Sequence, residues 1–370
     1  MDLVRSSALH ARAKAFVSAF ERGEPPPEAF DAFACELARY QAEHVPAYGR
    51  LLRARNVSSH TLERAAELPA VPTDAFKVTR IAAFDDAETS AAFRTSGTTI
   101  GARGTHAMRD VSTYDAGAVA FGRHWLTRDL ASRVPVIVLA PPPSEAADSS
   151  LVHMCAAFAE SFGVETAPEA VFVVEGDVID VERFDARVAY ALAEEVPIVV
   201  LATSFALVHF LEGMDDVTFA LPTGSRVMQT GGYKGKSREV DGAELRTEIA
   251  RVFGIPRRSV VSEYGMTELS SQFYERTLFD ETAPEGLFAE PPWARVVPVD
   301  PETLEPVADG EVGIAKIIDL LNVDSAVSVL TQDRVRRASD GFELLGRAPG
   351  APPRGCSIAM DEILGRTGPS

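Results

Sequence analysis

The sequence predicts an α/β fold, and three observations support it. Between residues 84 and 256, short apolar runs alternate with helical segments of about ten to fifteen residues. The two most apolar runs, residues 134–140 and 196–202, have the length of buried strands and are far shorter than the roughly 20 residues of a membrane-spanning helix. After residue 288 the pattern changes to short alternating segments, with hairpin signals at Asp309-Gly310 and Asp340-Gly341. We expect mostly parallel sheets covered by helices, followed by a small antiparallel unit.

The chain begins with a predicted helical lead-in, because Phe16, Phe20 and Phe33 recur at near-helical spacing. Pro69 and Pro72 then require an extended connector, since neither residue continues a helix. The expected organisation is a helical lead-in over 1–68, a core over 69–345 with its antiparallel unit at about 288–345, and a short C-terminal tail over 346–370.

Charge and cysteine content exclude several classes of protein. Of the 370 residues, 54 are Asp or Glu and 36 are Lys or Arg, which gives a net charge of −18 and argues against nucleic-acid binding. The N-terminus lacks the apolar segment of a secretory signal, and no run is long enough to span a membrane, so we expect a cytoplasmic protein. Cys35, Cys155 and Cys356 are far apart and lack C-x-x-C spacing, so we expect thiols, the first two in the core.

The first candidate site is the segment RTSGTTIGARGTH, residues 94–106. Its glycines and small hydroxyl residues leave backbone N–H groups able to surround an anion such as a triphosphate. Arg103 and His106 flank it as possible charge partners. The spacing matches neither a Walker loop nor a dinucleotide turn, and an ordinary Ser/Thr/Gly surface turn is the alternative. The candidate phosphate-binding residues are Thr95, Ser96, Gly97, Thr98 and Thr99.

The second candidate site is the segment VVSEYGMTE, residues 260–268. A strand-like start runs into a glycine turn, which would present Tyr264, Thr267 and Glu268 at the carboxyl end of a strand, where α/β proteins bind ligands. Thr267 offers a hydroxyl to a phosphate oxygen, and Glu268 offers a hard oxygen ligand to Mg²⁺. The alternative is a loop leading into a helix with Thr267 as its N-cap.

The two motifs, in this order and about 170 residues apart, resemble those of the adenylate-forming enzymes: acyl-CoA synthetases, nonribosomal adenylation domains and luciferases. The resemblance implies ATP and Mg²⁺ as cofactors, with the first motif on the ATP phosphates and the second on AMP and the metal. It also implies that the aspartate of the segment TQD holds the ribose hydroxyls and that the segment LGR marks a hinge before a C-terminal lid. The further nucleotide-binding residues that it implies are Gly231, Gly232, Tyr264, Gly265, Thr267, Asp333 and Arg347.

Within that superfamily, the short length and the segments PAVPTDAFK and APPPSEAADSSLVHM look most like the acyl-protein synthetase of the bacterial luminescence fatty-acid reductase system. Phenylacetate-CoA ligases are the next most similar group. The resemblance implies a fatty acid or other carboxylic acid as substrate, an acyl reductase as partner and an acyl transferase as a further one. It also implies a cysteine acceptor near the C-terminus. Cys356 fits, because it follows Arg354-Gly355, which resembles the superfamily's mobile loop; a small packed residue in a strand is the alternative.

The sequence departs from the family pattern in two places. Where the family has a lysine after the first motif, this sequence has the segment IGAR, and the alternatives are that Arg103 stands in for the lysine or that the phosphates are held more loosely. The sequence ends 23 residues after Arg347, and the usual C-terminal lid and its lysine have no counterpart. The positive charge is then expected from Arg103, Lys234 or Lys236, or from a partner protein.

Two residues are candidates for substrate binding. His153 lies where the superfamily places a group beside the substrate carboxylate, with a packed or helix-capping histidine as the alternative. Phe205, with Leu207, is a candidate wall of an acyl pocket, with a core position as the alternative. Three functions stay open: an ATP-dependent acyl-protein synthetase, a CoA ligase of the phenylacetate type, and a non-catalytic nucleotide-binding scaffold. The short C-terminus argues against the second, and the missing lysine supports the third.

Overall fold

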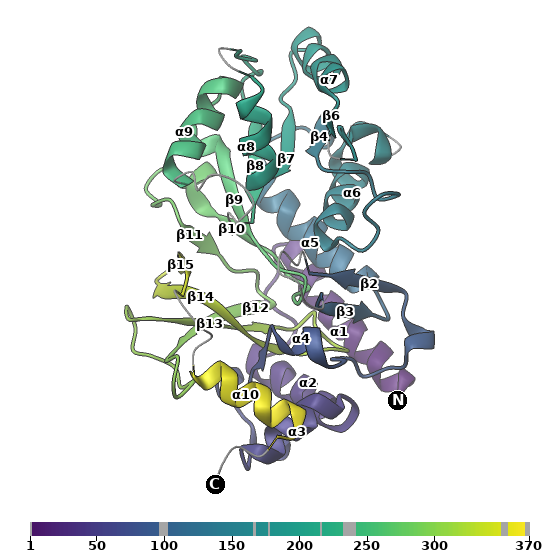
Figure 1. The fold of residues 1–370 in the computed structure, drawn as a ribbon, viewed down its shortest axis with the longest axis vertical. Coiled ribbons are helices and arrows are strands. Elements are labelled where there is room, and N and C mark those ends of the chain that lie inside the picture. The colour runs from purple at the N-terminus through teal and green to yellow at the C-terminus, as the bar shows by residue number, and fades with distance from the viewer. Residues whose placement is uncertain are drawn as a thin grey trace. The chain divides into compact units, whose positions relative to one another are not determined.

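The computed structural model describes residues 2–95, 103–165, 168–176, 178–214, 217–231, 242–348 and 354–366. The chain divides into two compact units, each of which is described by itself (Figure 1). Unit 1 comprises residues 1–120, 266–271 and 286–370, and unit 2 comprises residues 121–265 and 272–285. Both units combine helices with sheet, which confirms the predicted α/β class. No helix in the described ranges has the length and apolar character needed to cross a membrane.

Unit 1 begins with three helices, α1 (Leu3–Glu21), α2 (Phe30–His44) and α3 (Pro46–Ala54). The Asp2 carboxylate caps α1 by accepting from the backbone N–H of Arg5 at 2.9 Å, and proline at the first position of α3 suits a helix start. The aromatic residues that predict this region pack inward, and the rings of Phe16 and Phe33 stack at 5.7 Å. The connector follows as β1 (Val71–Pro72) and α4 (Ala75–Val78).

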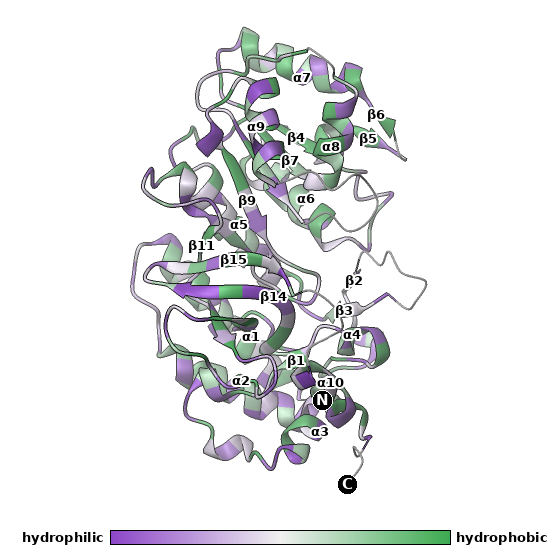
Figure 2. Ribbon diagram, turned by 60° about the vertical axis from the view of Figure 1, so that its left-hand side comes forward, coloured by the Kyte–Doolittle hydropathy of each residue, from purple (hydrophilic) through white to green (hydrophobic). Residues whose placement is uncertain are grey.

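The sheet of unit 1 is antiparallel. It contains β11 (Leu287–Ala289), β12 (Ala294–Val299), β13 (Val312–Asp319), β14 (Ser328–Ala338) and β15 (Gly341–Arg347) in the order β12-β13-β14-β15-β11, with β1 parallel to β14. The predicted hairpin at Asp340-Gly341 is confirmed, because β14 and β15 pair across it and Gly341 has a φ of +145° that favours glycine. The chain turns at Asp309-Gly310, where Gly310 has a φ of +84°, but β12 and β13 are joined by the longer segment 300–311, so no tight hairpin forms there. Figure 2 shows β14 changing between hydrophobic and hydrophilic along its length, as its polar second half leaves the core.

Two smaller elements complete unit 1. The hairpin of β2 (Ala91–Arg94) and β3 (Thr105–Met108) carries the first motif, and α10 (Arg354–Leu364) packs against α3 and β1. Helix α5 (Ser112–Leu126) begins in unit 1 and ends in unit 2.

Unit 2 holds the parallel sheet. Strands β4 (Val136–Leu139), β7 (Val199–Thr203), β8 (Arg226–Thr230) and β9 (Val260–Tyr264) run parallel, and β10 (Phe273–Glu275) pairs antiparallel with β9. Strands β4 and β7 are almost wholly buried, which confirms the two apolar runs as strands. Because the four strands are parallel, their carboxyl ends meet at one edge. The helices between them are α6 (Ser150–Phe162), α7 (Val181–Ala193), α8 (Ser204–Glu212) and α9 (Gly242–Phe253), with a small hairpin of β5 (Val174–Glu175) and β6 (Val178–Ile179).

Candidate functional site

The first motif lies in the loop of the β2–β3 hairpin. Arg94 pairs with Thr105, and the loop between them is closed by two hydrogen bonds: the N–H of Thr95 donates to the Gly104 carbonyl at 2.9 Å, and the N–H of Gly104 donates to Thr95 Oγ1 at 2.9 Å. Gly104 suits this position because a Cβ there would lie 3.1 Å from the Thr95 methyl group. The other predicted phosphate-binding residues lie outside the described residues: Ser96, Gly97, Thr98 and Thr99.

Arg103 is exposed at the end of this loop, and its guanidinium folds back on its own hairpin. Its Nε donates to the Thr95 carbonyl at 2.8 Å, and its Nη2 donates to the Arg94 carbonyl at 3.3 Å. The side chain therefore braces the base of the loop. Its role as a substitute for the missing lysine stays a prediction.

The second motif crosses the boundary between the units. Tyr264 ends β9 and Gly265 follows it in unit 2, and residues 266–271 belong to unit 1. A Cβ on Gly265 would meet the carboxylate of Glu263, so any larger residue there displaces that side chain. Thr267 and Glu268 form a turn in which the N–H of Leu269 donates to the Met266 carbonyl at 3.1 Å, and no helix follows before β10. The alternative of Thr267 as a helix N-cap is therefore wrong.

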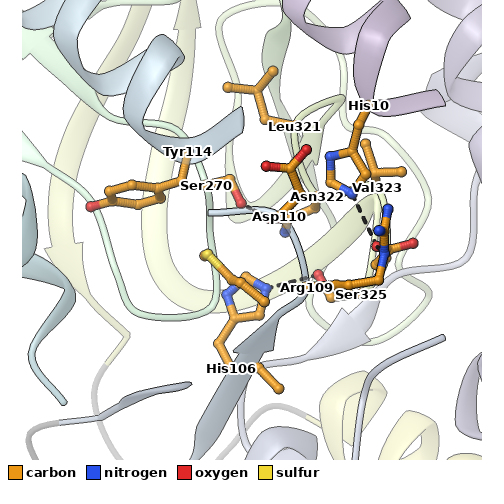
Figure 3. Close-up of a pocket in the computed structure, with 13 residues that line it drawn as sticks. His10, His106, Arg109, Asp110, Tyr114, Ser270, Leu321, Asn322, Val323 and Ser325 are labelled. Carbon is orange, nitrogen blue, oxygen red and sulfur yellow. Dashed lines mark hydrogen bonds and ion pairs between the residues drawn. The ribbon is translucent and has the colours of Figure 1, made fainter. Parts of the chain in front are cut away.

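The backbone of this turn is bound by side chains from distant parts of unit 1. His106 Nδ1 lies 2.8 Å from the Thr267 carbonyl. Its Nε2 lies 2.9 Å from Ser325 Oγ (Figure 3). Asn322 Nδ2 donates to the Glu268 carbonyl at 3.0 Å. From the sequence, His106 is predicted only as a charge partner of the first motif, and no role is predicted for Asn322 or Ser325. Their signal was three polar residues, at 322, 324 and 325, within the otherwise apolar run LLNVDSAV.

The same region contains a second polar network, centred on the buried carboxylate of Asp324. It accepts hydrogen bonds from His10 at 3.0 Å, Arg109 at 3.1 Å, Ser6 at 2.7 Å and Tyr40 at 3.0 Å. Burial raises the pKa of Asp324, but these donors outweigh it and the pKa is lowered overall. The adjoining cavity has a volume of about 20 Å³, which has room for one water and not for a nucleotide. This network therefore attaches α1 and α2 to the loop between β13 and β14.

Asp333 and Arg347 come together in the sheet of unit 1. They are paired residues of β14 and β15, and Arg347 Nη2 donates to Gln332 Oε1 at 3.2 Å. Thr331 Oγ1 accepts from the backbone N–H of Asp333 at 3.0 Å. Their roles at a ribose and at a hinge stay predictions.

The remaining candidate residues lie at the strand ends of unit 2. Gly231 has a φ of +75°, and its carbonyl accepts from Ser204 Oγ at 2.9 Å. His153 is partly buried in the first turn of α6, and Phe205 is 47% exposed on α8. Leu207 belongs to the core of unit 2, so the core alternative holds for that residue. The predicted residues outside the described ranges here are Gly232, Lys234 and Lys236.

Cys356 lies in α10 and is buried. Its side chain packs among Ala70, Val299, Ile314 and Leu330, and its residue is 3% exposed. Burial raises the pKa of the Cys356 thiol to about 11. The Arg354-Gly355 pair thus begins a helix where the sequence predicts a loop. The three cysteines are free thiols, and Cys35 and Cys155 are in the core as expected.

Comparisons with known proteins identify the family of this chain. The family model for acyl-protein synthetase, LuxE, matches residues 23–365. The chain belongs to this family. A long-chain-fatty-acid–luciferin-component ligase of Aliivibrio fischeri is 23% identical over 322 residues, which cover 82% of this chain and 80% of the relative.

Solved structures confirm the fold. A 2-hydroxyisobutyryl-CoA ligase in complex with 2-HIB-AMP and CoA has a TM-score of 0.60 at 15% identity, over 94% of this chain and 69% of that one. An open conformation of the same ligase, in complex with 2-HIB-AMP and CoA, has a TM-score of 0.57 at 14% identity, over 85% of this chain and 73% of that one. The family and the fold together make this chain an acyl-adenylate-forming ligase.

Proposed function

We propose that the chain activates a fatty acid, expected to be long-chained, as acyl-AMP and then transfers the acyl group to a protein cysteine. The family match over residues 23–365 carries this proposal. The relative from Aliivibrio fischeri, named for a long-chain fatty acid, supports the substrate class. An acyl reductase is the expected recipient of the acyl group, with an acyl transferase as a further partner.

The residues of unit 1 fit ATP with Mg²⁺. Mg²⁺ bound with a nucleotide commonly takes one or two carboxylates, the phosphates and water. We assign buried Glu268 as that carboxylate, because it belongs to the turn of the second motif beside Thr267. When bound, Mg²⁺ neutralises charge on the phosphates. In this proposal the phosphates contact the hairpin loop, which Arg103 braces, and the Thr267 hydroxyl. Asp333 and Arg347 lie at the ribose of the nucleotide.

The reaction has two steps. A carboxylate oxygen of the acid attacks the α-phosphorus of ATP, and pyrophosphate leaves. The Cys356 thiolate then attacks the acyl carbon, AMP leaves with the bonding electrons, and the thiol proton passes to solvent. Because Cys356 is buried in the observed position of α10, the second step requires this helix to leave its site. Gly346 is suited to that rotation, since it has a φ of +78° and no atom lies within 4 Å of its Cβ position.

To test this function, the protein is incubated with radiolabelled fatty acid and Mg-ATP. The label that hydroxylamine releases from the protein is then measured, because hydroxylamine cleaves an acyl thioester. We expect Cys356→Ser to lose the label and the buried-thiol controls, Cys35→Ser and Cys155→Ser, to retain it. Label on Cys356→Ser would reject the acceptor. Carboxylate-dependent exchange of pyrophosphate into ATP tests the first step separately, because it requires no thiol.

Transfer to CoA is a second candidate function, as in ligases of the phenylacetate type. One observation favours it: the Cys356 thiol is buried and its pKa is raised to about 11, both unfavourable for an acyl acceptor. The structural relative bound to 2-HIB-AMP and CoA supports the same possibility. Acyl-CoA formation without label on the protein would establish this function in place of the first.

A further inference from the structure

His106 belongs to two structural features at once. It is the second residue of β3, directly after the hairpin loop that carries the first motif. Its imidazole also contacts the turn of the second motif at the Thr267 carbonyl, 161 residues away along the chain. The side chain is therefore a direct link between the two motifs.

The hydrogen bonds define the tautomer of this imidazole. A carbonyl oxygen only accepts, so the nitrogen that faces Thr267, Nδ1, carries the proton. In the neutral ring Nε2 is then an acceptor, and the hydroxyl of Ser325 donates to it at 2.9 Å. Neutrality follows from burial, since His106 is 2% exposed and its pKa is lowered to about 4. Both ring nitrogens thus have one matched partner.

The contact fixes a peptide plane in the second motif. The Thr267 carbonyl and the Glu268 N–H belong to one trans peptide, so holding the carbonyl on His106 directs the N–H to the opposite side. The next carbonyl, that of Glu268, is held by Asn322. Ser270 and Ser271 are held by Asp319, with the Ser270 N–H at 2.9 Å and the Ser271 hydroxyl at 2.7 Å. The turn is therefore held at its first peptide by the β2–β3 hairpin and beyond it by the loop that follows β13.

We propose that His106 is a positioning residue, which holds Thr267 and Glu268 against the β2–β3 hairpin by donating Nδ1–H to the Thr267 carbonyl. The proposal rests on the proposed nucleotide site. In this role His106 contacts neither substrate nor metal. It determines where the Thr267 hydroxyl and the Glu268 carboxylate lie relative to the strands β2 and β3.

Two near-isosteric substitutions separate the two hydrogen bonds. In His106→Asn the amide nitrogen takes the place of Nδ1 and keeps the donor to Thr267, while the Ser325 contact is lost. In His106→Gln the amide takes the place of Nε2 and keeps the Ser325 contact, while the donor to Thr267 is lost. Each variant removes one hydrogen bond of His106, so both are expected to lower the melting temperature by similar amounts.

The readouts are carboxylate-dependent pyrophosphate exchange and the melting temperature. We expect His106→Asn to stay within about threefold of the wild-type kcat/KM, and His106→Gln to lose at least about tenfold, which is about 1.4 kcal/mol of transition-state stabilisation. If His106 only stabilised the fold, the activity of each variant would follow its melting temperature. Equal activity in the equally stable Asn and Gln variants would therefore overturn the proposal. Greater loss in the Asn variant would do the same.

A binding measurement separates this proposal from the proposed function. If wild type shows no exchange with any fatty acid, the proposed function fails, and calorimetric titration with Mg-ATP then decides the role of His106. We expect His106→Gln to bind Mg-ATP at least tenfold more weakly than His106→Asn. Equal affinities, or no binding of Mg-ATP by wild type, would overturn the positioning role.

Discussion

The buried carboxyl of Glu263 predicts how the stability of unit 2 depends on pH. Glu263 ends β9, it is 6% exposed, and it accepts a hydrogen bond from Thr230. Burial raises its pKa from 4.5 to about 7, although the hydrogen bond lowers it. A carboxyl with a pKa raised on folding stabilises the fold fully below pH 4.5, and this contribution is lost as pH rises through 7. The 2.5-unit difference corresponds to about 3 kcal/mol.

Glu263→Gln keeps the shape and removes the ionisation. We expect the variant and wild type to unfold alike at pH 4, and the variant to be more stable by about 3 kcal/mol at pH 9. Urea unfolding is followed by the fluorescence of Trp125, the tryptophan of unit 2, in a Trp293→Phe background. The exposed Glu182→Gln is the control and should follow wild type at every pH. Parallel curves for Glu263→Gln and wild type from pH 4 to 9 would refute this account of Glu263.

Three further predictions follow from burial and backbone geometry. Arg246→Met breaks the buried ion pair with Glu275 and should lower the free energy of unfolding, measured by urea titration, by about 3–5 kcal/mol. The control is the exposed Arg258→Met, which should change the same free energy by less than about 0.5 kcal/mol. Gly341→Ala should lower the melting temperature strongly, because at a φ of +145° the added Cβ would clash with the carbonyl oxygen of Phe288. Gly310→Ala is the control: no atom lies within 4 Å of its Cβ position, so it should lower the free energy of unfolding by only about 1 kcal/mol. In a protein with Cys35 and Cys155 replaced, iodoacetamide should alkylate Cys356 about a thousandfold more slowly in the native state than in urea. Equal alkylation rates in the two conditions would contradict the burial of Cys356.

The elements with local signals were predictable from the sequence. The apolar runs became β4 and β7, because a strand covered on both faces is apolar throughout. The Asp340-Gly341 turn became the β14–β15 hairpin, because glycine tolerates the backbone that this turn requires. These signals need no information from the rest of the chain.

The contacts of His106 were not predictable in the same way. The sequence identifies a histidine near a phosphate loop, and a cation is its usual interpretation there. The neutral form follows from its burial against segments more than 160 and 200 residues away, at Thr267 and Ser325. Such long-range packing decides the pKa, and no local pattern contains it. The role of Asn322 has the same origin, since its amide contacts Glu268 and Ser270, which are more than 50 residues away along the chain.

The sequence around Cys356 contains a helical pattern, although we predicted a mobile loop there. Cys356, Ala359 and Ile363 recur at helical spacing, and all three are buried in α10. Exposing these side chains and breaking the Arg55–Glu362 pair would cost about 4 kcal/mol, which corresponds to an undocked population of about one in a thousand. A thiol acceptor with that population would limit transfer a thousandfold. Acyl transfer through Cys356 therefore requires that formation of acyl-AMP favours the undocked helix, and alkylation should accelerate when fatty acid and Mg-ATP are added together.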